Sequence, residues 1–218
     1  MIPFTVDQFL RAFERYNTAV WPAQLILYVI ALAVVYLAFQ QRTDFSKSIA
    51  SILSVFWIWM GLVYHLWFFS SINRTALLFA LFFALQGILF FIAGVLKSDL
   101  RFRLRRDLLG ITGSVFLIYA LVIYPALGYW FSHRYPAAPT FGLPCPTTIF
   151  TFGLLLCTDR RVPLYLLPIP LAWSFIGGSA AISLGITEDL GLLAAGLLVL
   201  LLITLQRTRL FRSRALSG

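Results

Sequence analysis

Residues 133–153 read HRYPAAPTFGLPCPTTIFTFG and form a polar, proline-rich interruption in an otherwise apolar chain. The stretch contains His133 and Cys145, and a proline lies on each side of the cysteine. Each proline removes a backbone donor and breaks a helix interior. Proline suits the first position of a helix, so we expect the chain to turn here and to begin a new helix at Pro146.

The rest of the chain has the composition of a polytopic membrane protein. Of its 218 residues, 61% are hydrophobic and 11% are charged, and the mean hydropathy is +0.90. Soluble domains carry about 25% charged residues. The first residues lack the pattern of a cleavable signal peptide. Phenylalanine and charged residues recur there at helical spacing, which predicts an amphipathic helix over residues 1–17 that lies in the membrane interface.

The apolar runs predict an all-α helix bundle of seven transmembrane helices. Crossing the hydrocarbon core of roughly 30 Å takes about 20 helical residues at 1.5 Å each. The candidate segments are residues 18–39, 49–70, 75–96, 107–131, 146–158, 163–184 and 188–206. This transmembrane domain would therefore cover residues 18–206, and a basic cytoplasmic tail would follow over residues 207–218.

The positions of the basic residues predict the orientation of the bundle. Thirteen of the 17 Lys and Arg residues lie in every second connecting segment: 40–48, 97–106, 159–162 and 207–218. Basic segments beside spans are typical of the cytoplasmic side. We therefore predict that the N-terminus lies outside and the C-terminus inside. The net charge of +9 is explained in the same way, so the expected partner is the lipid bilayer and not nucleic acid.

The predicted fifth helix is too short to cross the membrane. Residues 146–158 would give about 20 Å of helix, roughly 10 Å less than the hydrocarbon core. The charged run at 159–161 holds the cytoplasmic end, so the gap falls on the outer side. Non-helical backbone at this depth must be buried in protein or line a cavity. We therefore predict a re-entrant loop over about residues 136–145; the alternative is a tilted helix that begins near Thr140.

Most polar residues within or beside the predicted spans fall in the outer third of the bilayer. Polar groups are costly in a membrane and are functional candidates by default. The predicted ligand-binding residues are Gln24, His65, Asn73, His133, Cys145, Thr147, Thr148, Glu188 and Asp189. Their shared depth predicts one outward-facing pocket around Cys145. Positions at the water interface without any function would explain the same depth, and Glu188 and Asp189 also fit the first turn of a capped helix.

The sequence contains no complete catalytic motif. P-loop, HExxH, GxSxG and CxxC patterns are all absent. The sequence therefore predicts no catalytic residue, and it does not identify a cofactor. Cys145, His65 and His133 are of the types that bind soft metal ions or haem, and they are the candidate metal ligands.

Several stretches resemble a family of bacterial integral membrane proteins of unknown function. The most specific is Pro-Cys-Pro-Thr-Thr at residues 144–148. The others include Trp21-Pro22-Ala23-Gln24, Tyr64-His65, Ile72-Asn73, Pro139-Thr140-Phe141-Gly142 and Glu188-Asp189. The resemblance implies a multi-pass protein of the bacterial inner membrane, and it carries no assigned activity.

Three functions remain as hypotheses. The first is a protein that binds or transports a small solute or a soft metal ion in a pocket around Cys145. The second is a membrane redox or haem protein that uses Cys145 with His65 or His133. The third is a non-catalytic accessory subunit of a membrane complex, or a homo-oligomer. In that case Gly177 and Ala181, small residues at four-residue spacing, would let a partner helix approach.

Overall fold

The computed structural model describes residues 3–40, 42, 44–159 and 161–215, and these residues are predominantly helical, without a β-strand among them. The α-helices are α1 (Val6–Ala19), α2 (Ala23–Phe39), α3 (Phe45–Trp59), α4 (Ala76–Phe91), α5 (Leu108–Ile118), α6 (Tyr124–Trp130), α7 (Pro144–Leu156), α8 (Pro168–Leu184) and α9 (Leu190–Ala215). Short π-helical segments extend α3 over Met60–Phe68 and α4 over Ile92–Leu96, and a third joins α5 to α6 over Tyr119–Ile123. The remaining helical turns are the 3₁₀ segments Phe69–Ser71, Leu164–Leu166 and Thr187–Asp189.

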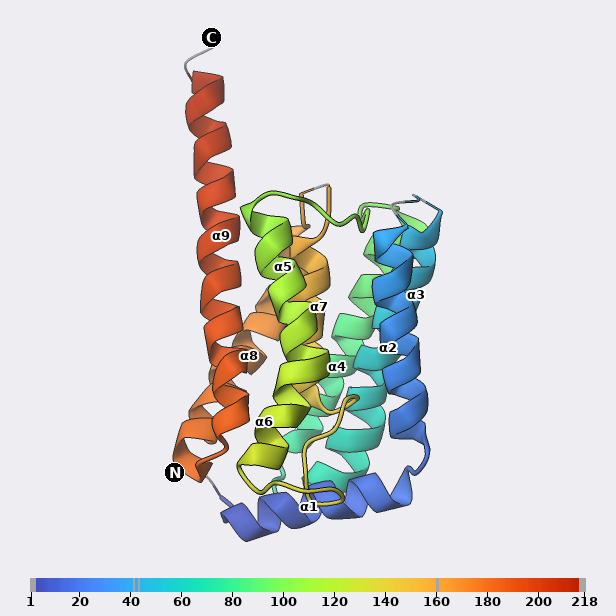
Figure 1. The fold of residues 1–218 in the computed structure, drawn as a ribbon, viewed down its shortest axis with the longest axis vertical. Helices are drawn as coiled ribbons and strands as arrows, with labels where there is room; N and C mark the ends of the chain where they lie inside the picture. The colour runs from blue at the N-terminus through green and yellow to red at the C-terminus, as the bar shows by residue number, and fades with distance from the viewer. Residues whose placement is uncertain (1–2, 41, 43, 160, 216–218) are drawn as a thin grey trace.

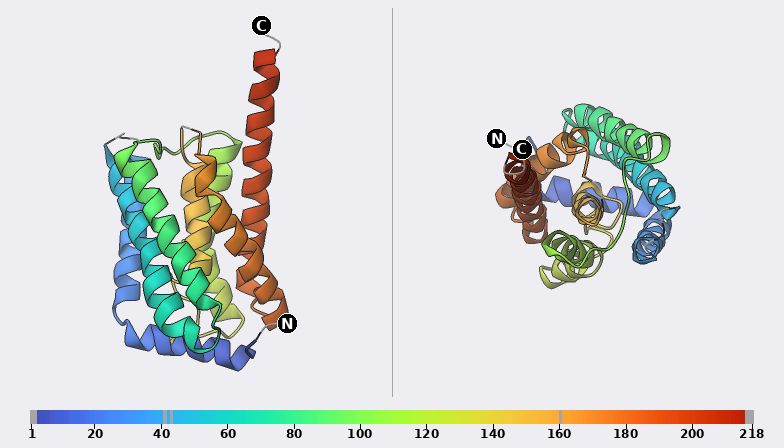
Figure 2. Two further views of the ribbon diagram at one scale, coloured as in Figure 1. Left: turned by 180° about the vertical axis from the view of Figure 1, so that it is seen from behind. Right: turned by 90° about the horizontal axis from the view of Figure 1, so that it is seen from above.

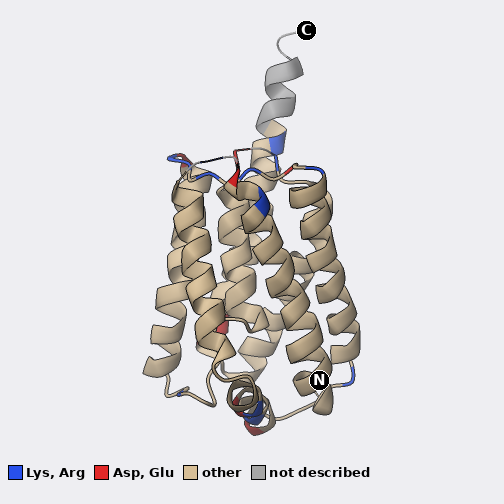
Figure 3. Ribbon diagram, turned by 90° about the vertical axis from the view of Figure 1, so that its right-hand side faces the viewer, with Lys and Arg blue, Asp and Glu red and all other residues tan. Residues whose placement is uncertain are grey.

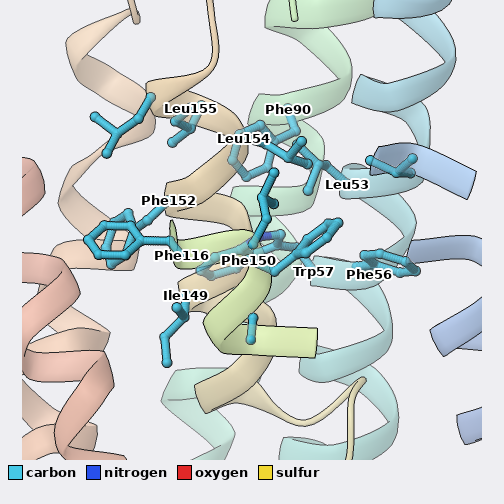
Figure 4. Close-up of a cluster of buried hydrophobic side chains, with 14 of the residues drawn as sticks. Leu53, Phe56, Trp57, Phe90, Phe116, Ile149, Phe150, Phe152, Leu154 and Leu155 are labelled. Carbon is cyan, nitrogen blue, oxygen red and sulfur yellow. The ribbon is translucent and has the colours of Figure 1, made fainter. Parts of the chain in front are cut away.

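The helices form a ring with α7 at its centre. The view along the bundle in Figure 2 shows the other helices around α7, and Figure 1 shows α1 crossing one end of the bundle. The axes of α1 and α2 meet at 85°. All 13 residues of α7 are buried. Its side chains, among them Phe150 and Leu154, pack against Leu53 and Trp57 of α3 in the hydrophobic core (Figure 4).

The structure supports a membrane-embedded protein built of apolar helices. Within the part of the chain that the structure describes, five helical segments are long and apolar enough to cross a membrane: Phe45–Ser71, Ala76–Leu96, Leu108–Trp130, Leu164–Leu184 and Thr187–Thr208. The bent pair of α1 and α2 raises the number to six if it counts as one span. Large apolar side chains such as Val29, Leu81 and Leu201 are exposed on the outside of the ring. Such a surface fits contact with lipid.

The central helix begins earlier than the sequence predicted. We expected its first residue to be Pro146, but α7 starts at Pro144, so Cys145 lies within the first turn. The first backbone N–H groups of a helix have no intrahelical acceptor, so this turn tolerates both prolines. The chain from Phe141 to Leu143 is buried, and it enters the ring from the α1 end (Figure 1). The buried end of this connection fits the predicted re-entrant loop, and we call residues 133–143, between α6 and α7, the re-entrant loop.

The opposite end of the bundle carries most of the basic residues (Figure 3). There the backbone N–H of Arg103 donates to the carbonyl of Cys157 at 2.6 Å, which ties the end of α7 to the connection before α5. Asp107 accepts a hydrogen bond from the N–H of Gly110 at 3.1 Å and pairs with Arg105. Burial alone would raise the pKa of Asp107, but these two partners lower it below its ordinary value.

Glycines allow the ring helices to approach α7 and each other closely. A Cβ on Gly153 of α7 would lie 2.9 Å from the carbonyl oxygen of Gly113 on α5. On α8, a Cβ on Gly177 would lie 2.9 Å from the Leu192 side chain of α9, and Ala181 is buried. The small-residue face of α8 is therefore covered within the chain.

Candidate functional site

A cavity of about 210 Å³ lies beside the first turn of α7, at the end of the bundle that α1 covers. Most of its lining is apolar. Aromatic rings come from Phe4, Phe9, Phe13, Tyr64, Phe69, Phe79 and Trp173, and polar groups come from Asn73, Cys145, Ser179 and Asp189. A cavity of about 150 Å³ with an apolar lining is large enough to bind benzene. This cavity therefore has room for a small organic molecule.

The turn before α7 determines where Cys145 points. Gly142 has φ +96°, in the left-handed region that favours glycine, and a Cβ there would lie 2.5 Å from the Leu27 side chain. Its N–H donates to Oγ1 of Thr147 at 3.1 Å, which closes the turn onto the first turn of α7. The side chain of Cys145 is thus held at the wall of the cavity, with only 8% of the residue exposed.

Glu188 and Asp189 are buried at the same end of the bundle. They lie in the 3₁₀ turn before α9, and both carboxylates have partners elsewhere in the fold. The hydroxyl of Tyr124 donates to Oδ1 of Asp189. Nδ1 of His133 lies 2.7 Å from Oε1 of Glu188. These acids therefore join α6 and the re-entrant loop to the start of α9, a role that the capping pattern in the sequence did not indicate.

The two acids differ in their electrostatic surroundings. Glu188 forms an ion pair with His133 when the imidazole is protonated. Within the described ranges, the other ion pairs are Arg42–Asp44 and Arg105–Asp107, so none reaches Asp189. The side chain that donates a hydrogen bond to Asp189 is that of Tyr124, and Cys145 lines the same cavity; both groups are neutral. Buried carboxylates are normally balanced by a cation or a proton. The cationic group that acts on Asp189 is the His133 imidazole, which is hydrogen-bonded to Glu188 and not to Asp189.

The structure places His65 away from the other candidate ligands. The imidazole is fully buried among the rings of Tyr64, Phe83 and Trp173, with centroid distances of 5.2, 4.5 and 5.1 Å. Neither ring nitrogen has a hydrogen-bond partner within the described part of the chain. His133 contacts Glu188 instead. Among the described residues, no group of three or more His, Cys, Asp or Glu side chains is arranged to hold a metal ion, so Cys145, His65 and His133 are not brought together.

The remaining predicted residues are divided between two sides of the re-entrant loop. Asn73 lines the cavity, and its Oδ1 accepts a hydrogen bond from the N–H of Thr75 at 3.0 Å. Thr148 is buried, and its hydroxyl has no partner among the described residues. Gln24 lines a separate depression of about 300 Å³ with His133, on the α2 and α6 side of the loop.

Three residues of this end of the bundle were not predicted from the sequence. Tyr124 donates a hydrogen bond to Asp189, and Trp173 lines the cavity. Among many aromatic residues, nothing in the sequence distinguishes these two. Asn17 is fully buried, and its Nδ2 donates to the carbonyls of Pro136 and Ala138, both at 2.7 Å. The sequence did contain one signal for Asn17: it lies in the predicted amphipathic helix directly after Tyr16, an aromatic residue of the buried face.

Comparison with known proteins gives a family but no activity. No curated protein and no solved structure matches the chain. The family described as "Family of unknown function (DUF6064)" matches residues 6–215, which include every α-helix of the described residues. The match agrees with the resemblance of the sequence to an uncharacterised family. The chain therefore belongs to the family of unknown function DUF6064.

Proposed function

We propose that this protein is an integral protein of the bacterial inner membrane that binds or passes a small solute in the cavity beside Cys145, from the outer face. The observation that carries the proposal is the position of the cavity at the break before α7. There an irregular turn meets the N-terminus of a short helix inside the bundle. Broken helices of this kind form the substrate sites of many transporters.

The lining of the cavity supports binding of a small organic molecule. Ligand sites are mostly apolar and contain a few polar groups that orient the ligand. Here Cys145 and Asp189 provide such groups on one side, and rings of α1, α4 and α8 provide the apolar wall. The enclosure by α1 also fits a site that separates its ligand from lipid.

The alternative functions have weaker support in the geometry. A soft-metal or haem site built from Cys145, His65 and His133 would require these side chains to converge, whereas His133 binds Glu188 and His65 lies within an aromatic cluster. An accessory subunit that docks through Gly177 and its neighbours would need a free face on α8. That face packs against α9.

The proposal can be tested by labelling Cys145 in intact cells with a membrane-impermeant maleimide. Cys157 is changed to Ala so that Cys145 is the single thiol, and Cys145→Ser, which retains Cys157, is the matched control. We expect labelling from outside. We also expect at least one member of a panel of small neutral, cationic and anionic solutes to slow it.

Two outcomes would contradict the proposal. Labelling of Cys145 only after the cytoplasmic side is opened would overturn the outward orientation. Labelling that no solute slows, together with an unchanged unfolding temperature of the purified protein in the presence of every solute, would overturn solute binding.

A further inference from the structure

We infer that the ligand of the Cys145 cavity is a small organic cation, with its ammonium group beside Asp189 and in contact with aromatic rings of the lining. This inference rests on the proposed function and specifies its ligand class. It starts from the charge of the lining. Among the described residues that line the cavity, Asp189 is the only one with a charged side chain.

Among the described residues no Lys or Arg side chain pairs with Asp189, and the imidazole of His133 is the one cationic group that favours its negative charge. Tyr124 donates a hydrogen bond to Asp189 but brings no charge. The one nearby imidazole, that of His133, lies against Glu188. A buried carboxylate without a cationic partner either binds a proton or pairs with a cation from outside. The adjoining cavity gives such a cation a place to bind.

The aromatic part of the lining has the chemistry that recognises ammonium groups. Tyr64 stacks on Phe69 with a centroid distance of 5.6 Å, and Phe79 meets Trp173 edge to face at 5.3 Å. The faces of such rings attract cations, and aromatic cages are a common means of binding quaternary ammonium groups. Trp173 belongs to this part of the lining, and its indole N–H, buried and without a hydrogen-bond partner among the described residues, is available to a polar ligand atom.

The size of the cavity limits the ligand. With about 210 Å³, the cavity is somewhat larger than one that holds benzene. A ligand of roughly six to twelve non-hydrogen atoms would fit by that comparison. Neither a lipid nor a peptide fits this limit. A small amine or quaternary ammonium compound fits both the volume and the charge.

Choline and its neutral isostere 3,3-dimethylbutan-1-ol separate charge recognition from shape recognition. Their affinities for the full-length protein in detergent would be measured by equilibrium dialysis. Cation–aromatic and carboxylate contacts in a desolvated site predict that choline binds at least about tenfold more tightly than the alcohol. In Asp189→Asn we expect the two affinities to become equal within about threefold. Asp7→Asn removes the same charge from an exposed position of α1 and should retain the preference.

The ligand pair tests the inference in the unmodified protein, whether or not Asp189→Asn folds. Equal affinities for choline and the alcohol would overturn the cation inference while leaving a solute site in place. If neither compound binds but another solute of the panel protects Cys145 from labelling, the cation inference is likewise overturned and a solute site remains. Absence of binding by every compound would overturn the proposed function as well.

Discussion

Asn17→Ala should release the re-entrant loop from the rest of the bundle. The asparagine side chain donates to the carbonyls of Pro136 and Ala138 and accepts from the hydroxyl of Thr140, each at 2.7 Å. A hydrogen bond of this kind contributes about 0.5–1.5 kcal/mol net, so losing three should cost about 2–4 kcal/mol. Applied to local opening of the loop, this free energy raises the open population by roughly 30- to 700-fold.

Tryptic cleavage after Arg134, which is exposed at the start of this loop, reports the opening. Cleavage follows the open population when the loop opens and closes faster than the protease acts. We expect trypsin to cut Asn17→Ala in detergent at this site roughly 30- to 700-fold faster than the wild type, as followed by mass spectrometry. On the scale of soluble domains of this length, the unfolding temperature would fall by about 4–16 °C.

Asn73→Ala is the matched control, because it removes the other asparagine at this end of the bundle. Asn73 accepts one hydrogen bond, from the backbone of Thr75. We expect this variant to leave cleavage after Arg134 within about threefold of the wild-type rate. If Asn17→Ala is cut no faster than Asn73→Ala, Asn17 does not hold the loop, and the buried side chains of Phe141 and Leu143 must do so.

Three further predictions concern helix packing, the buried acid and the basic end. Gly153→Ala should destabilise the protein by about 1–3 kcal/mol, because its Cβ meets a carbonyl of α5, whereas Gly128→Ala has room and should be neutral or stabilising in thermal unfolding. Tyr124→Phe should cost about 1–3 kcal/mol, because Asp189 loses a buried donor, and chemical denaturation would measure the change. Folding lowers the pKa of Asp107, so ionised Asp107 stabilises the folded protein at neutral pH, and this stabilisation is lost as the pH falls through the folded pKa. When the pH is lowered from about 6 to about 3, the unfolding temperature of Asp107→Asn should therefore fall less than that of the wild type.

The sequence was most informative about the positions of the helices. Apolar runs and alternating basic segments are local features, and each of the seven predicted segments is largely helical in the structure. The short central helix and the loop before it also followed from length and from the two prolines. The first residue of that helix could not be predicted, because prolines at 144 and 146 are compatible with a single first turn as well as with a break between them.

The candidate site could be predicted only in part. Cys145 and Asp189 were both selected for their depth in the membrane, but their neighbours depend on contacts between distant parts of the chain. Tyr124 and Asp189 are 65 residues apart, and Asn17 lies 119 residues from Pro136. Periodicity and composition carry no information about such pairs. The apolar surroundings of His65 are a packing outcome of the same kind, which its place beside an aromatic residue did not reveal.

The central position of α7 should determine which mutations this gene tolerates. A helix beside lipid has one side on which any apolar residue serves, so tolerated substitutions recur every 3.6 residues. All residues from Pro144 to Leu156 are enclosed by protein. A library of single substitutions should therefore give a striped pattern of tolerance along α2, α4 and α9. Along α7 it should give one unbroken block of intolerance, as in the core of a soluble protein.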